Sequence, residues 1–261
     1  MEWYIYFVVI FIGFIAGFIN TLAGSGSLLT LPLLMFLGLP ANVANGTNRI
    51  AILLQNIVGV SSFKKQKVFE FKEGYRLAIP AVLGSVIGAQ IAVGFNEELM
   101  RKTIGGLLLF MFFIILYKPD KWIKGQVGKI IGKPTILQIV IFFFIGIYGG
   151  FIQAGVGFFL LAGLVLGAGA DLIKANALKM FIILIYTIFA LTIFMIHKQV
   201  DYKMGLVLAV GNMAGAFIAA KFAVNWGVKF VRYILLIVII FASAKFLGLF
   251  EYISGLVIHL R

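Results

Sequence analysis

Long apolar runs separated by short polar breaks are the feature of this sequence that most restricts its fold. Apolar residues make up 62% of the 261 residues and charged residues 12%, against about 45–50% and about 25% in soluble domains. A chain this apolar cannot hide its side chains in one core, so lipid must be the solvent for much of its surface. The sequence therefore predicts an integral membrane protein.

Eight of the runs fit a transmembrane helix, which needs about 20 predominantly apolar residues. The predicted spans are residues 4–21, 43–63, 75–95, 103–117, 136–153, 172–196, 204–224 and 229–249. We expect helices, because the strands of membrane barrels alternate polar and apolar residues and these runs do not. The predicted fold class is an all-α polytopic membrane protein.

Two further apolar pieces, residues 27–37 and 158–166, have about half the length of a span at a rise of about 1.5 Å per residue. Each follows a glycine-containing break, Gly24-Ser25-Gly26 in one case and Gly155-Val156-Gly157 in the other. Short segments interrupted by glycine at matching places in two halves point to the binding site of a transporter. We therefore expect two short broken or re-entrant helices beside such a site.

Glycines and asparagines recur in register between the two parts of the chain. The matched pairs are Gly13 with Gly146, Gly24 with Gly155, Gly26 with Gly157, Asn45 with Asn176, and Gly84 with Gly211. Similar apolar composition alone would not keep these residues in register. We therefore predict two homologous repeats, residues 1–117 and 135–250, followed by a C-terminal tail at residues 251–261.

The predicted repeats are joined by a basic linker, residues 118–134, which carries five lysines and one aspartate. The positive-inside rule places this linker in the cytoplasm. With eight crossings, both termini and the loops at residues 64–76 and 197–203 would share its side of the membrane. If the two short pieces cross fully instead, each repeat has five spans, the repeats are inverted and the termini lie outside.

The two breaks have the chemistry of an anion site. Glycine accepts a positive φ and lets a ligand approach the backbone closely. A helix that begins after the break directs free N–H groups and a partial positive charge at that point. Ser25 and Ser27 add hydroxyl groups, and Gln153 directly precedes the second break. The alternative is close helix packing through small residues, which Gly13 and Gly17 fit well.

A second group of candidate residues lies at the start of the span at residues 43–63. Its members are Asn45, Thr47, Asn48 and Arg49, with Asn176 and Lys179 as counterparts in the second repeat. Spacings of three and four residues place amides and a cation of each set on one helical face. Such a face suits an anion with several oxygens, such as a sulfonate or sulfite. The alternative is a solvated helix start whose two cations snorkel to the interface.

Several classes of chemistry lack the residues they need. Cysteine is absent and both histidines lie at the ends of runs, so we expect no metal site and no cofactor. No histidine within a span could activate Ser25, so we do not expect an enzyme. All nine acidic residues lie at segment ends, which leaves no carboxylate in mid-membrane for a proton relay.

The remaining expectations concern partners. The net charge of +13 is carried by Lys and Arg between the apolar runs, which fits the positive-inside rule and not nucleic-acid binding. The first run has no basic segment before it and no cleavage site after it, so we expect it to stay in the protein as a helix. Expected partners are membrane lipid and a small anionic solute. The sequence leaves open whether the protein forms a homo-oligomer.

The first-repeat motifs resemble those of the TauE/SafE sulfite and sulfonate exporter family. The similarity lies in Gly13-x3-Gly17, Gly24-Ser25-Gly26-Ser27, Pro32, Leu34, Gly38 and Ala44-Asn45-Gly46-Thr47-Asn48. The resemblance implies a multi-pass protein of the plasma (inner) membrane that exports sulfite, sulfoacetate or taurine-related sulfonates. The chain departs from the family pattern at Ser25 and Ser27, where many members have glycine, and at Gly163, which stands opposite Pro32.

Two alternatives stay open at this stage. One is an anion channel with the breaks as its filter, and the other is a transporter of another small carboxylate or inorganic anion. Export could run on the membrane potential alone, since an anion that leaves a negative interior gains about 2.3 kcal/mol per charge per 100 mV. Uptake would need a coupled ion that the sequence does not identify.

Overall fold

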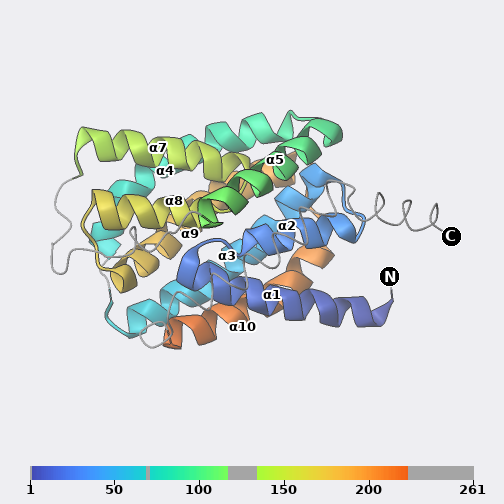
Figure 1. Ribbon diagram of the computed structural model, residues 1–261, viewed down its shortest axis with the longest axis horizontal. Helices are drawn as coiled ribbons and strands as arrows, with labels where there is room; N and C mark the ends of the chain where they lie inside the picture. Colours follow the sequence, from blue (N-terminus) through green and yellow to red (C-terminus); the bar gives the residue numbers. More distant parts are fainter. Residues whose placement is uncertain (1, 69–70, 117–133, 223–261) are drawn as a thin grey trace.

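The computed structural model describes residues 2–68, 71–116 and 134–222, and all regular structure within them is helical (Figure 1). The helices are α1 (Trp3–Ala23), α2 (Ser27–Phe36), α3 (Ala41–Lys65), α4 (Phe71–Val93), α5 (Glu97–Leu116), α7 (Ile136–Phe151), α8 (Val156–Ala162), the π-helical turn η1 (Gly163–Gly167), α9 (Leu172–Ile196) and α10 (Tyr202–Phe222). The predicted all-helical fold class is confirmed for this part of the chain.

Four of the described helices are long and apolar enough to cross a membrane: α1, α4, α9 and α10. The predicted spans at residues 43–63, 103–117 and 136–153 correspond to α3, α5 and α7. Helix α3 is less apolar than the others because it carries polar side chains that are buried inside the protein, among them Arg49 and Gln55. The span at residues 229–249, the tail at 251–261 and the basic linker, residue 134 apart, lie outside the described residues.

The two predicted short pieces are confirmed as short helices, α2 and α8 with its continuation η1. Gly24 and Gly155, which begin the two breaks, have φ angles of 74° and 73°, a backbone conformation that favours glycine. Helix α2 then turns back along α1, because Gly26 packs on the carbonyl of Ala16 while Leu34 packs in one cluster with Val9. Helices α1 and α2 therefore form a hairpin.

Close helix pairs hold the fold together through glycine. On α1, a Cβ at Gly17 would overlap the backbone of Asn212 on α10, and Gly215 lies against the backbone of Phe14. The same contact recurs between α4 and α7, where Gly150 lies against the backbone of Ser85. Small residues let membrane helices approach closely, so the packing interpretation of Gly13 and Gly17 is confirmed.

Helix α3 connects the two ends of the molecule. Near its start, the Thr47 hydroxyl accepts a hydrogen bond of 2.8 Å from the backbone N–H of Asp201. Just after its end, the Gln66 amide donates a hydrogen bond of 3.0 Å to the carbonyl of Ala220. The loops at residues 64–76 and 197–203 therefore lie at opposite ends of α3. The expectation that they share one side of the membrane is wrong, because α2 returns toward the start of α1 and thereby changes the number of crossings.

The first helices of the two predicted repeats run in opposite directions. Helix α1 runs parallel to α10, since Ile10 and Phe14 contact Gly211 and Gly215 in the same order. Helix α7 runs parallel to α4, since Gly146 and Gly150 contact Ala81 and Ser85. Figure 1 shows α7 beginning at the end of the molecule opposite the start of α1. Each first helix thus packs on the fourth helix of the other predicted repeat.

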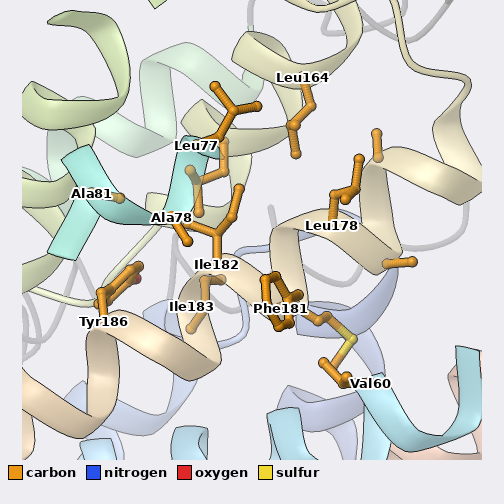
Figure 2. Close-up of a cluster of buried hydrophobic side chains, with 14 of the residues drawn as sticks. Val60, Leu77, Ala78, Ala81, Leu164, Leu178, Phe181, Ile182, Ile183 and Tyr186 are labelled. Carbon is orange, nitrogen blue, oxygen red and sulfur yellow. The ribbon is translucent and has the colours of Figure 1, made fainter. Parts of the chain in front are cut away.

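The core lies where α3, α4 and α9 come together (Figure 2). Leu178, Ile182 and Tyr186 of α9 are fully buried and face Leu77 and Ala81 of α4. This packing buries one face of α9, and Asn176 and Lys179 near its start are buried with it. The fold thereby places the candidate residues of α3 and α9 inside the protein.

Candidate functional site

The two glycine breaks meet in the folded protein. A Cβ added to Gly24 would overlap the backbone of Gly157, and a Cβ added to Gly157 would overlap the backbone of Gly24. Residues far apart in the sequence therefore touch backbone to backbone, which glycine alone permits. In this conformation the contact leaves no space for a solute between these two glycines.

Arg49 of α3 binds the C-terminal end of α7. Its side chain is fully buried, with Nη1 3.1 Å from the Gly149 carbonyl oxygen and Nη2 2.5 Å from that of Gly150. Nη2 also lies 3.4 Å from the carbonyl oxygen of Phe151, and the guanidinium stands 4.5 Å from the ring centre of Phe194. The last carbonyls of a helix have no partner within it and carry a partial negative charge, so Arg49 offsets the charge of this helix end.

Lys179 of α9 makes the corresponding contact with the C-terminal end of α1. Its ammonium nitrogen lies 2.9 Å from the carbonyl oxygens of Asn20 and of Thr21 and 2.7 Å from the side-chain oxygen of Asn176. An ammonium group has three N–H donors, and all three are used here. The two contacts are therefore reciprocal between the predicted repeats. Helix α3 of the first repeat supplies the cation at the end of α7, and α9 of the second repeat supplies the cation at the end of α1.

Among the described side chains, no buried carboxylate lies beside these two cations. Among the residues whose side chains the structure describes, the buried polar set contains Arg49 and Lys179 but no Asp or Glu. A helix end offsets only about half an elementary charge. Among the described residues, the two helix ends therefore offset only part of the charge of the two cations, which favours an anion beside them.

Two polar clusters lie beside the cations. In one, the side-chain oxygen of Gln55 accepts hydrogen bonds of 3.3 Å from Asn20 and 3.2 Å from Asn212. In the other, Gln153 donates a bond of 2.9 Å to the hydroxyl of Tyr186, whose backbone carbonyl accepts a bond of 3.4 Å from Ser85. The first cluster joins the end of α1 to α3 and α10. The second joins the segment after α7 to α9 and α4.

Comparison with known proteins identifies the family. Residues 9–246 match the model of the sulfite exporter TauE/SafE family. The chain belongs to this family. It is 27% identical to the probable membrane transporter protein ORF9 of Sinorhizobium sp. over 90% of this chain and 89% of that protein. It is also 28% identical to the probable membrane transporter protein YfcA of Escherichia coli K12, over 92% of this chain and 88% of that protein.

A probable membrane transporter protein of Haemophilus influenzae is similar over the same extent, with 24% identity over 90% of this chain and 91% of that protein. No solved structure matches the chain. These similarities run through nearly the whole chain, so this TauE/SafE protein is a membrane transporter by family, as the motifs of the first repeat predict.

The structure gathers part of the predicted site around the end of α7. The side chain of Asn45 donates a bond of 2.8 Å to the carbonyl of Phe151, which Arg49 also contacts. Gln153 lies two residues beyond the helix end and reaches Tyr186. The snorkelling alternative is wrong for both Arg49 and Lys179, because each side chain is fully buried.

Other predicted residues connect helices. The side-chain amide of Asn48 donates a bond of 3.1 Å to the hydroxyl of Ser27 and accepts one of 2.6 Å from Thr30, which joins α2 to α3. Thr47 lies apart from the cations and binds the turn before α10. Gly155 packs against the side chain of Met111 on α5.

Several buried polar side-chain atoms make no hydrogen bond to any described residue. They include Ser25 Oγ, Asn45 Oδ1, Arg49 Nε, Gln153 Oε1, Thr187 Oγ1 and Asn212 Oδ1. A buried polar group left without a partner costs about 1–3 kcal/mol. Four of these atoms belong to residues of the predicted site, Ser25, Asn45, Arg49 and Gln153, which makes that site suited to a polar ligand.

Sequence reasoning missed Asn20, Asn212 and Tyr186 as neighbours of the cations. A signal existed for Asn212, which interrupts an apolar run well away from both of its ends, whereas Asn20 lies beside the end of its predicted span. Tyr186 gives no such signal, because tyrosine within an apolar span is also a common packing residue. A cavity of about 450 Å³ between α7, α8 and η1 is mostly apolar and contains none of the predicted residues.

Proposed function

We propose that this protein exports small organic-sulfur anions, such as sulfite and sulfonates, across the plasma membrane. The observation that carries the proposal is the pair of buried cations, Arg49 and Lys179, with no carboxylate among the buried side chains that the structure describes. A buried charge is expensive unless something offsets it. Helix ends offset part of this charge, and a transported anion would offset the rest.

Arg49 is the residue that we assign to the anion. Its three hydrogen bonds come from Nη1 and Nη2, while Nε makes none to any described residue. Arginine has five N–H donors in a planar fork, a geometry that suits a group with several oxygens. Lys179 has all its donors engaged, so its part is to hold the helix end and to contribute charge. Ser25 supplies a further buried hydroxyl near the first break.

We further propose that the chain consists of two inverted repeats, each with four long spans and one short helix that returns toward the side on which its first helix begins. The opposite directions of α1 and α7, the glycine contacts common to both first helices and the two polar clusters support this arrangement. The parts that move in transport would not be the repeats themselves. One part would hold α1, α2, α3 and α10, the other α4, α7, α8 and α9, because the closest packing joins helices in these groups. Rocking of one part against the other would expose the anion to alternate sides.

The test is flux into proteoliposomes that contain the purified protein. Sulfite, sulfoacetate, taurine, sulfate and acetate are supplied in turn, with a potential and a pH gradient imposed separately. We expect saturable flux of sulfite or a sulfonate above that of empty liposomes. Absence of flux for sulfite, sulfoacetate and taurine alike would refute the proposal, and large unitary currents in a planar bilayer would indicate a channel instead.

A pair of variants links the flux to the site. Arg49→Gln removes the buried cation, and we expect at least a tenfold loss of flux. Arg101→Gln is the matched control, since Arg101 is an exposed arginine paired with Glu97 on the surface of α5. Equal flux from both variants would remove Arg49 from the site, provided that both elute as folded protein in gel filtration.

A further inference from the structure

The ends of α1 and α7 have the composition of cation sites. In secondary transporters with broken helices, the carbonyl groups at the C-terminal ends of the half-helices coordinate the coupling Na⁺ or H⁺. Here each of the two helices ends inside the protein at a glycine break, and its last carbonyls point at a partner. The partner in both cases is a side chain of the protein and not a site open to solvent.

Lys179 fills the position at the end of α1. The three oxygens around its nitrogen, from Asn20, Thr21 and Asn176, lie at 2.7–2.9 Å. The carbonyl of Asn20 also accepts the backbone N–H of Gly24 at 2.8 Å. With these oxygens engaged and the side chain fully buried, a metal ion would have to displace the ammonium group to bind.

Arg49 fills the position at the end of α7 in the same way. It contacts three successive carbonyls, those of Gly149, Gly150 and Phe151, and the amide of Asn45 adds a further donor to the last of them. Both cation positions are therefore occupied by charges that belong to the chain and cannot leave with the solute.

We propose that Arg49 and Lys179 are tethered substitutes for coupling cations, so that anion flux through this protein needs neither Na⁺ nor a proton gradient. The inference rests on the proposed function and specifies how the anion is driven. The anion then carries the only charge that crosses the membrane in a transport cycle, so the membrane potential sets the direction of flux. For a monovalent anion, 100 mV would then support a concentration ratio of roughly 50-fold.

The first test uses the wild-type protein in proteoliposomes, with radiolabelled sulfite and sulfoacetate as probes. Choline replaces Na⁺ on both sides, and a potential is set by K⁺ and valinomycin at equal pH. We expect flux to be unchanged without Na⁺ and to reverse when the potential is reversed. Flux that stops in choline, or uphill flux of fully ionised sulfoacetate driven by a pH gradient alone, would overturn the inference but leave the proposed function intact. No flux of any anion would refute both.

The second test examines the position at the end of α1 without measuring flux. Lys179→Ala deletes the ammonium and leaves space, whereas Lys179→Met deletes the charge and fills the space. Propylammonium is added at constant ionic strength against choline. We expect it to raise the Tm of Lys179→Ala by several degrees and to leave those of Lys179→Met and wild type unchanged. An equal response of all three proteins, or none in a folded Lys179→Ala, would overturn the inference. If neither variant folds, the first test, which measures flux through the wild-type protein, decides whether the inference holds.

Discussion

Replacing Gly24 by alanine tests the contact between the two breaks. Gly24 has a φ of 74°, and a left-handed backbone costs a residue with a Cβ about 1–2 kcal/mol. The new Cβ would also overlap the backbone of Gly157, which no change of rotamer can relieve, and overpacking costs about 1–3 kcal/mol. Together these effects predict a loss of about 2–5 kcal/mol in the free energy of unfolding.

Variants at two other glycines distinguish the cost of the positive φ at Gly24 from the cost of the overlap with Gly157. Gly38 has a φ of 91° but no heavy atom within 4 Å of an added Cβ, so Gly38→Ala should lose only about 1–2 kcal/mol. Gly105, within α5, has no positive φ and no atom within 4 Å. Gly105→Ala should be neutral or gain up to about 1 kcal/mol from helix propensity.

The assay is reversible unfolding of the three variants in mixed micelles, followed by far-UV circular dichroism during titration with sodium dodecyl sulfate. The reasoning requires the order of stability to be Gly105→Ala, then Gly38→Ala, then Gly24→Ala. If Gly24→Ala were as stable as Gly38→Ala, the two breaks would not touch in the folded protein, and the arrangement of the site around them would be wrong.

Three further predictions concern the polar interior and the surface. Asn45→Ala and Asn176→Ala should each reduce sulfite flux in proteoliposomes by severalfold without loss of folded protein, and wild-type rates in both would exclude these amides from the site. Gln55→Leu should lower the free energy of unfolding by about 2–6 kcal/mol, because it leaves two buried amides without their acceptor at about 1–3 kcal/mol each; a loss below 1 kcal/mol would contradict the cluster. Arg101→Gln should change stability by less than about 1 kcal/mol, since its ion pair is exposed, and a larger loss in the same titration would show that the pair is not a surface pair.

The helices could be predicted from hydropathy where apolar residues alone define them. Helix α9 has the predicted bounds, because both of its ends coincide with polar residues. Helix α5 begins at Glu97 and not at residue 103. Its first turns carry Glu97, Glu98, Arg101 and Lys102, which pair along the helix surface, so the helix continues where the apolar run has stopped.

The site could be predicted in its residues but not in its contacts. The sequence shows polar groups on one face of α3, yet both a solvated helix start and a buried site fit that pattern. Burial of Arg49 depends on the end of α7, a hundred residues away in the sequence. The direction of α2 could not be predicted either, because a short helix that crosses the membrane and one that turns back have the same hydropathy.

The glycine contacts between α1 and α10 also have a consequence for how the protein is made. Helix α1 leaves the ribosome before α10, and the surface against which Gly13 and Gly17 pack is synthesised almost 200 residues later. Until then, the amide of Asn20 must stay in the bilayer without Asn212 near it. Neither repeat expressed alone should therefore form a stable fold, whereas co-expression of the two fragments should restore it.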